Sequence, residues 1–324
     1  MRALVTGGAG FIGSHLAERL LAEGHDVTVI DDLSTGRMEN LPLNLRCSVV
    51  LKDLSTHVDI QGVFDARFDW VFHLAALAAI VPSVEDPLAY HRANADGTFR
   101  VLEAARARGV KRFIYAASSS CYGLATVFPT PEEAPIAPQY PYALTKWVGE
   151  QYALHWMQVY GLPVVSLRLF NVYGPRQRTA GTYGAVMGVF LAQKANGQPL
   201  TIVGDGTQTR DFTYVTDVVD AMVKAAESDI TGVFNVGSGH TYAVDALADL
   251  IGGNRIHIPK RPGEPDCTFA DTRKIQQALR WEPQVDFADG VNGMLERLED
   301  WRQAPVWTPE SIAVSTAAWH RYLA

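Results

Sequence analysis

The residues Thr6-Gly7-Gly8-Ala9-Gly10-Phe11-Ile12-Gly13 directly follow the apolar run Ala3-Leu4-Val5 near the start of the chain. This order predicts a strand that ends in a glycine-rich turn and opens into a helix. The turn fits the pattern G-x-G-x-x-G as Gly8, Gly10 and Gly13. In that pattern the glycines allow a tight turn, close approach of a pyrophosphate and close helix packing. The first helical turn would offer free N–H groups to the anion, although a plain strand–turn–helix gives the same local pattern.

A second strand supports the interpretation as a dinucleotide site. Residues 26–30 read as a strand that ends at Asp31. That position is roughly twenty residues beyond the turn, where a carboxylate holds the ribose hydroxyls of an adenosine. Asp32 would repel a 2′-phosphate, so we expect NAD rather than NADP as the cofactor. Arg37 is the nearby basic residue that argues for the alternative.

The bulk composition is that of an ordinary globular protein. The chain has 324 residues, of which 48% are hydrophobic and 19% charged, with a net charge of -7. The negative charge argues against nucleic acid or an anionic membrane as a partner. The three cysteines, Cys47, Cys121 and Cys267, lack metal-ligand spacing and cannot all pair, so we expect no metal and a reducing compartment. With no leader-like segment or membrane-length apolar stretch, we expect a soluble cytoplasmic protein.

The order of elements predicts the fold class. Further strand-like runs cover residues 47–51, 70–74, 112–117 and 164–169, and helical patterns cover 88–108 and 142–160. Alternating strands and helices predict an α/β fold with a doubly wound, Rossmann-type parallel sheet. We expect residues 1–170 and about 211–236 (strand, helix, strand) to form the NAD-binding domain. Residues 171–210 and 237–324 would form a smaller, discontinuous substrate domain that ends in a surface helix over 305–324.

Two separate segments suggest catalytic chemistry. Tyr142 and Lys146 lie four residues apart, on one face of a predicted helix. A lysine ammonium near the phenol would lower the tyrosine pKa, which makes a general base for a sugar hydroxyl. Ser118 follows the predicted strand 112–117, so it would lie at the sheet edge where ligands bind. A surface helix pair and a polar turn would give the same patterns in isolation.

Taken together and in order, these residues make the chain resemble an extended short-chain dehydrogenase/reductase of the nucleotide-sugar epimerase and dehydratase family. The resemblance extends over almost the whole chain. The matching residues are Thr6 to Gly13, Asp31 to Leu33, Asp53-Leu54, His73 to Ala76, Asn94, Gly97-Thr98, Ser118 to Gly123, Tyr142, Lys146, Arg168 to Pro175, Arg210 to Phe212, Asn235 to Gly237 and Arg261 to Glu264.

The resemblance implies a role for each matched residue. The catalytic residues would be Ser118, Tyr142 and Lys146. The cofactor would contact Gly7, Gly10, Phe11, Ile12, Gly13, Asp31, Asp32, Asp53, Leu54, Leu74, Ala75, Ala76, Asn94, Tyr142 and Lys146. The substrate would contact Ser119, Ser120, Asn171, Arg178, Arg210, Arg261, Glu264 and Thr268. Among these, the arginines 210 and 261 would hold the phosphates, and Glu264 would accept from the uridine ribose.

A departure from the family pattern indicates the reaction. The family's 4,6-dehydratases carry Asp and Glu directly after the catalytic hydroxyl, and its nucleotide-glucuronate decarboxylases carry a glutamate there. This chain has Ser119 and Ser120 instead. Serine is too weak an acid to protonate a leaving hydroxide near neutral pH. We therefore expect NAD-dependent 4-epimerisation through a transient 4-keto sugar. A nucleotide-sugar reductase, a dehydratase and a non-catalytic NAD-sensing protein remain as alternatives.

The sequence leaves more than one sugar open as the substrate. A small Thr268 leaves room for an N-acetyl group, so UDP-glucose/UDP-galactose and the N-acetylhexosamine pair both fit the pattern. Arg176 and Arg178 could instead pair with the carboxylate of UDP-glucuronate.

We also expect a homodimer built on the helices over 88–108 and 142–160, because the second carries Val148, Leu154, Trp156 and Val159 on more than one side. Loops that cover these residues would be the alternative.

Overall fold

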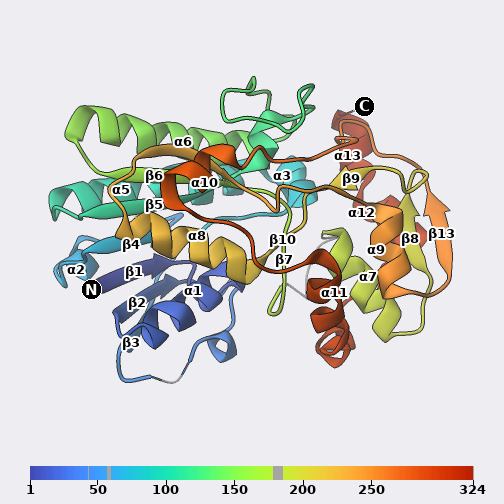
Figure 1. Ribbon diagram of the computed structural model, residues 1–324, viewed down its shortest axis with the longest axis horizontal. Coiled ribbons are helices and arrows are strands. Elements are labelled where there is room, and N and C mark those ends of the chain that lie inside the picture. Colours follow the sequence, from blue (N-terminus) through green and yellow to red (C-terminus); the bar gives the residue numbers. More distant parts are fainter. Residues whose placement is uncertain (43, 57–59, 178–184, 324) are drawn as a thin grey trace.

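The main sheet has the predicted parallel architecture (Figure 1). A computed structural model describes residues 1–42, 44–56, 60–177 and 185–323. Within these ranges, seven parallel strands pair in the order β11-β6-β5-β4-β1-β2-β3. They are β1 (Arg2–Thr6), β2 (Asp26–Asp31), β3 (Cys47–Leu51), β4 (Trp70–His73), β5 (Arg112–Ser118), β6 (Val164–Leu169) and β11 (Gly232–Val236). Because the strand order reverses between β1 and β4, a crevice opens at the carboxyl ends of these strands.

Helices cover both faces of this sheet, as Figure 1 shows. Ala3 and Val5 of β1 pack in one apolar core with α1 (Phe11–Ala22) and α8 (Val215–Glu227). Leu4, between them, packs on the opposite face with α5 (Gly97–Ala107) and α6 (Pro141–Tyr160). This alternation is the two-residue period of a strand with both faces buried. The predicted doubly wound α/β fold is confirmed.

The predicted helix over residues 88–108 has three parts. It consists of α4 (Pro87–His91), the π-helical segment η2 (Arg92–Asp96) and α5. The π segment carries Asn94, which is fully buried. Its amide oxygen accepts from Leu77 N (2.8 Å) and its amide nitrogen donates to Thr145 Oγ1 (3.0 Å). The segment therefore connects the loop after β4 with α6.

A second lobe lies beside the sheet, at the right of Figure 1. Its core contains Phe190, Leu247 and Val291. Its strand pairs are β7 (Val172–Tyr173) with β10 (Thr213–Tyr214), β9 (Thr209–Arg210) with β12 (Tyr242–Ala243), and β8 (Leu200–Val203) with β13 (Arg255–Ile258). Its helices are α7 (Val186–Ala195), α9 (Val244–Ile251), α11 (Phe287–Leu295), α12 (Pro309–Ser315) and α13 (Ala317–Tyr322). Shorter elements elsewhere are η1 (Met38–Asn40), α2 (Gln61–Phe64), α3 (Ile80–Glu85), η3 (Ser119–Tyr122), α10 (Arg273–Leu279) and η4 (Leu298–Trp301).

The segment 211–236 returns to the main sheet only in part. β11 joins the sheet beside β6, as expected, whereas β10 pairs with β7 outside it. Beyond it, Ile275 of α10 and Trp281 belong to the core under the main sheet, and Trp281 Nε1 donates to the Asp217 carbonyl (3.1 Å). We therefore propose the two domains expected above with one change: about residues 273–281 belong to the NAD-binding domain rather than to the substrate domain.

The prediction of one surface helix over residues 305–324 is wrong. The tail forms two short helices, α12 and α13, and Trp319 is only 3% exposed. This indole packs inward because the tail folds back onto the rest of the molecule, which a local pattern does not reveal. No helix in the described part of the chain is long and apolar enough to cross a membrane.

Candidate active site

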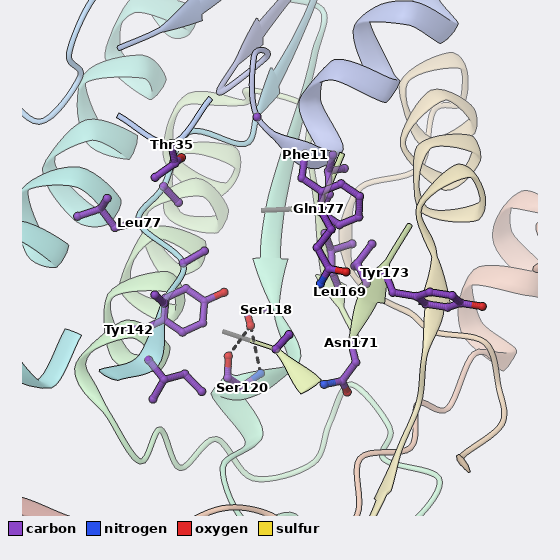
Figure 2. A pocket seen from close by; sticks show the side chains of 18 of the residues that line it. Phe11, Thr35, Leu77, Ser118, Ser120, Tyr142, Leu169, Asn171, Tyr173 and Gln177 are labelled. Atoms are coloured by element: carbon purple, nitrogen blue, oxygen red, sulfur yellow. Dashed lines mark hydrogen bonds between the residues drawn. The ribbon is translucent and has the colours of Figure 1, made fainter. Parts of the chain in front are cut away.

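A cavity of about 1130 Å³ opens at the carboxyl ends of the strands. One end is lined by the glycine turn, including Gly7 and Gly10 to Gly13, and the other by Arg210, Arg261 and Glu264. Ser118 and Tyr142 line the same cavity, and Figure 2 shows this middle part. The same cavity is thus lined by predicted catalytic residues, predicted cofactor-binding residues and predicted substrate-binding residues.

The glycine turn has no room for side chains at two positions. Gly7 has a φ of +70°, and a Cβ there would lie 2.8 Å from Ala75 N. A Cβ at Gly13 would lie 2.2 Å from the Gly7 carbonyl oxygen. The residue in the left-handed conformation is therefore Gly7, one position before the predicted G-x-G-x-x-G. Among the described residues, no side chain caps α1, so its first N–H groups remain available to an anion.

Asp31 ties the end of β2 to this turn. Its carboxylate accepts from Ala9 N (3.0 Å) and Leu33 N (2.8 Å), and the residue is 7% exposed. Burial raises the pKa of Asp31, and these two backbone N–H groups lower it in part. Asp32 accepts from Ser34 N (2.9 Å). Both carboxylates line the cavity, where they can accept from ribose hydroxyls.

The remaining predicted cofactor residues divide into two groups. Those in the cavity wall are Phe11, Ile12, Asp53, Leu54, Leu74, Ala75 and Ala76. Asn94 differs from them because it lies buried behind the wall and holds Leu77, which itself lines the cavity. We propose that Asn94 acts on the cofactor site through Leu77 rather than by direct contact.

Three residues converge between the sheet and α6. Ser118 ends β5, Ser120 lies in η3, and Tyr142 stands in the first turn of α6. The Tyr142 phenol lies beside both serines (Figure 2). The two serine hydroxyls bond to each other, and Ser120 N donates to Ser118 Oγ (3.3 Å). Figure 2 shows the phenol and the serines on the same part of the cavity wall.

The predicted lowering of the Tyr142 pKa by Lys146 is wrong. Burial raises the pKa of the Tyr142 phenol, and Ser118 and Ser120 lower it in part. Lys146 Nζ lies 4.4 Å from the centroid of the Tyr115 ring. Burial lowers the pKa of Lys146 to about 7, and the Glu150 carboxylate opposes that shift. Burial of both side chains, rather than their spacing along the helix, decides these pKa values.

A buried ion pair joins α6 to the main sheet. Arg168 donates to the Glu150 carboxylate through Nη2 (2.6 Å) and Nε (3.0 Å), and both side chains are less than a tenth exposed. Glu150 also accepts from Ser166 Oγ (2.9 Å), while Arg168 Nη1 donates to the Tyr122 hydroxyl (2.8 Å). The network joins α6, β6 and η3. The sequence signal for it was an arginine inside the otherwise apolar strand 164–169.

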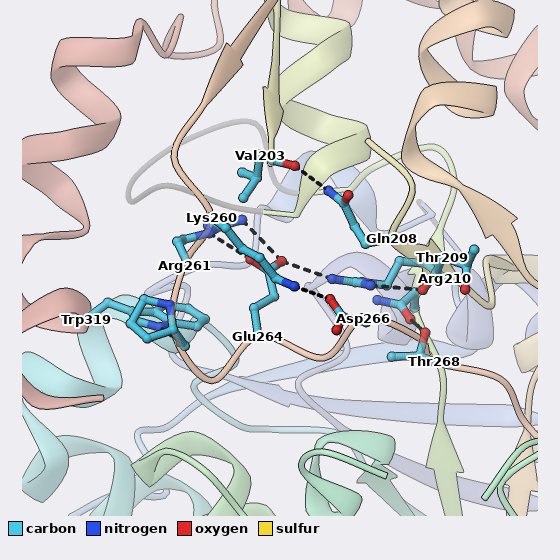
Figure 3. A network of polar contacts seen from close by, with 12 residues as sticks. Val203, Gln208, Thr209, Arg210, Lys260, Arg261, Glu264, Asp266, Thr268 and Trp319 are labelled. Carbon is cyan, nitrogen blue, oxygen red and sulfur yellow. Dashed lines mark hydrogen bonds and ion pairs between the residues drawn. The ribbon is translucent and has the colours of Figure 1, made fainter. Parts of the chain in front are cut away.

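Two arginines share one carboxylate at the other end of the cavity (Figure 3). Arg210 Nη2 lies 3.0 Å from Glu264 Oε1, and Arg261 Nε lies 2.9 Å from Glu264 Oε2. Nearby, Thr268 Oγ1 donates to Asn171 Oδ1 (2.8 Å). The structure therefore brings together all five of these predicted substrate residues.

Two other predicted substrate contacts remain. Ser119 lies in η3 and lines the cavity. Arg178 lies outside the residues that the structure describes. Its neighbour Arg176 lines the cavity, but its guanidinium pairs with Glu18 of α1 (2.6 Å). This pairing weakens the expectation that Arg176 receives a uronate carboxylate.

The comparisons with known proteins agree with this geometry. A family model described as the NAD dependent epimerase/dehydratase family matches residues 3–237. The chain belongs to this family. A UDP-glucose 4-epimerase of Mycolicibacterium smegmatis is 38% identical over 309 residues, which cover 91% of this chain and 98% of the relative.

Solved structures of epimerases match over nearly the same length. The UDP-glucose 4-epimerase of Thermotoga maritima with UDP-glucose has a TM-score of 0.87 and 36% identity, and the match covers 93% of this chain and 99% of that chain. The UDP-glucuronic acid 4-epimerase of Bacillus cereus with UDP-glucuronic acid and NAD has a TM-score of 0.86 and 33% identity, with coverages of 93% and 99%. The predicted family and the predicted NAD cofactor are confirmed.

The residues of this member of the NAD dependent epimerase/dehydratase family fit NAD. The glycine turn lets the loop after β1 pack closely on Ala75 and on α1, and the first turn of α1 offers its N–H groups to a pyrophosphate. Asp31 and Asp32 lie at the end of β2, where they can bind ribose hydroxyls and disfavour a 2′-phosphate.

Sequence reasoning missed two aromatic residues of the cavity wall. Tyr140 directly precedes α6, lines the cavity and stacks on Tyr142. Trp319 reaches the cavity from α13. An aromatic residue just before the helix-starting Pro141 was a weak signal for Tyr140, and nothing in the local sequence indicated Trp319.

Proposed function

We propose that this enzyme inverts the C4 configuration of a UDP-linked hexose. The observation that carries the proposal is the position of the Tyr142 phenol beside Ser118 and Ser120 (Figure 2), in one cavity with both the glycine turn and the paired arginines. NAD, when bound, accepts a hydride from the sugar and returns it. A reaction that regenerates its own cofactor requires no second substrate.

The side chains of this protein accept the proton of the sugar and bind the substrate. Tyr142 takes the proton of the C4 hydroxyl, and Ser118 hydrogen-bonds the same oxygen. Arg210 and Arg261 bind the diphosphate, because guanidinium groups make charge-assisted hydrogen bonds to phosphate oxygens. Asn171 and Thr268, bonded to each other, border the sugar. Lys146, one turn after Tyr142 in α6 and in the lining of the same cavity, would be part of the same site.

The chemistry of the serine turn argues against dehydration. Ser119 and Ser120 stand where the family's dehydratases carry acids, and alcohols do not protonate a leaving hydroxide at neutral pH. Two other groups in this turn could donate a proton, and burial raises the pKa of one of them, the Tyr122 phenol. The second is Cys121. It is 2% exposed and packs with Tyr122 and Phe170, and burial raises its pKa to about 12. The turn therefore lacks an acid for C6.

Deuterium uptake from the solvent distinguishes epimerisation from dehydration. In deuterated water, wild-type turnover should leave C4, C5 and C6 of the sugar free of deuterium, because epimerisation returns the same hydride. Mass spectrometry and proton NMR of the product would show this. Deuterium at C5 or C6, or loss of the C6 oxygen, would contradict the epimerase assignment and favour the dehydratase.

Three kinds of sugar are candidates for the substrate. UDP-glucose and UDP-galactose are supported by the names of the relatives. The small Thr268 side chain also suits the N-acetylhexosamine pair. The similarity to a UDP-glucuronic acid 4-epimerase favours the uronate, but the pairing of Arg176 with Glu18 leaves that cation already neutralised. We place the neutral hexoses first.

One incubation decides among these substrates. The purified protein is mixed in turn with UDP-glucose, UDP-N-acetylglucosamine and UDP-glucuronate, without added cofactor, and the products are separated by chromatography. We expect the C4 epimer of a neutral hexose. Epimerisation of UDP-glucuronate alone would replace our substrate. Turnover that depends on added NADPH would indicate a reductase, and bound NAD without any turnover would indicate a sensing protein.

A further inference from the structure

The C-terminal helix α13 forms part of the cavity wall. α13 ends the second lobe, but it packs against α3, which lies in the loop after β4 of the main sheet. From this position Trp319 lines the cavity at its substrate end. The last helix therefore contacts both parts of the molecule that border the site.

Trp319 contacts the loop that carries Arg261. Its indole Nε1 donates to the Pro262 carbonyl (2.5 Å). The Arg261 guanidinium carbon lies 5.4 Å from the centroid of the indole, within the range of a cation–π interaction. Figure 3 shows Trp319 beside Arg261. One side chain thus holds both the backbone and the charged group of this loop.

The indole and a carboxylate together constrain Arg261. Its guanidinium also donates to Glu264, which binds Arg210 as well. An arginine side chain has many rotamers, and restricting them before binding reduces the entropy lost when a phosphate is bound. Trp319 therefore acts on the cation that would receive the diphosphate.

We propose that Trp319 is a positioning residue for the nucleotide diphosphate, and that it holds Arg261 in the orientation that binds the phosphates. This inference rests on the proposed function for the identity of the ligand. It assigns a role in binding to the C-terminal helix, which lies outside the stretch matched by the family model. The chemistry at C4 belongs to Ser118 and Tyr142, so Trp319 acts on binding rather than on the chemical step.

The test compares three variants of the full-length enzyme. Trp319→Ala removes both contacts, and Trp319→Phe keeps a ring but loses the N–H donor. Tyr322→Ala is the matched control, because Tyr322 lies on the same helix and is 61% exposed. UDP affinity is measured by titration calorimetry, and kcat and KM are measured with the substrate identified above.

We expect Trp319→Ala to weaken UDP binding about tenfold and to raise KM with kcat unchanged. Trp319→Phe should be intermediate, and Tyr322→Ala should match the wild type. Because the role is exerted through Arg261, Trp319→Ala should cause no further loss of UDP affinity in an Arg261→Ala background. An unchanged affinity in Trp319→Ala, or an equal loss with and without Arg261, would overturn the inference.

The design separates a folding defect from a binding defect, and the positioning role from the proposed reaction. If Trp319→Ala does not fold, Trp319→Phe in both backgrounds gives the same comparison. A wild type that binds UDP but converts no sugar would refute the proposed reaction and leave the comparison of UDP affinities valid. A wild type that epimerises, with a Trp319→Ala variant that binds UDP normally, would refute the positioning role alone.

Discussion

The ring of Tyr140 lies parallel to that of Tyr142, with centroids 6.4 Å apart and planes inclined by 6°. Ser120 lowers the pKa of both phenols. Tyr140 also packs against Trp319, at 5.9 Å between centroids. A continuous row of rings therefore connects the proposed base with the residue that holds Arg261, and Tyr140 stands at its centre.

Replacing the proposed base should abolish the chemical step. In Tyr142→Phe we expect kcat to fall by about 10²–10⁴-fold, because only the proton-accepting oxygen is lost. The ring remains to pack against Tyr140, so the fold and bound NAD should persist in circular dichroism and cofactor analysis. Tyr152→Phe, at an exposed position of the same helix, is the control and should retain full activity. A normal kcat in Tyr142→Phe would remove the residue from its role.

The serine contact should appear in the pH dependence. A hydrogen bond to the phenolate favours its charged form, and accordingly Ser118 lowers the pKa of Tyr142. In Ser118→Ala the pKa rises, so the base form appears only at higher pH. The ascending limb of kcat/KM against pH should therefore move to higher pH. Ser119→Ala should leave the profile in place, and equal profiles for Ser118→Ala and the wild type would contradict the assignment.

Breaking the buried ion pair should destabilise the fold. Glu150→Gln removes the negative partner and leaves the Arg168 guanidinium buried without a counter-charge. We expect the free energy of unfolding in urea to fall by about 3–5 kcal/mol. Glu299→Gln removes a carboxylate from the exposed pair with Arg302 and should leave the unfolding curve unchanged. Similar curves for the two variants would mean that the buried pair contributes little.

We propose a homodimer through the outer face of α5 and α6. Phe99, Tyr152, Val159 and Tyr160 are each more than a third exposed, and Phe99 packs on Tyr152 with centroids 5.8 Å apart. Loops in the described part of the chain therefore do not cover these four side chains. Of the residues expected on this face, Val159 is exposed, Val148 and Leu154 are half-buried, and Trp156 is 6% exposed and donates to Glu103 (2.9 Å).

Light scattering tests this assembly. The wild type should have the mass of two chains at micromolar concentration, and Phe99→Glu should have the mass of one, because it places a charge within the proposed apolar interface. Leu124→Glu introduces the same charge at another exposed apolar position and should remain dimeric. A monomeric wild type would reject the dimer.

The sequence alone determined the parts of the molecule that depend on local order. Strand and helix patterns placed β1 to β6, because the period of apolar residues reflects which faces are buried. The residues of the glycine turn are contiguous, and Asp31 follows within the same strand–helix–strand unit, so the cofactor site was also visible. Even in this turn, only the folded structure shows that the residue with positive φ is Gly7, which lies against Ala75.

Tertiary structure decided the features that depend on distant contacts. Trp319 and Pro262 are 57 residues apart in the chain, and only the return of the tail brings them together. The i, i+4 spacing correctly placed Tyr142 and Lys146 on one helix, but burial in the folded chain set their pKa values. The sharing of Glu264 by Arg210 and Arg261 likewise follows from packing between loops. Local patterns report which side of an element is buried, whereas electrostatics and pocket shape depend on which elements pack together.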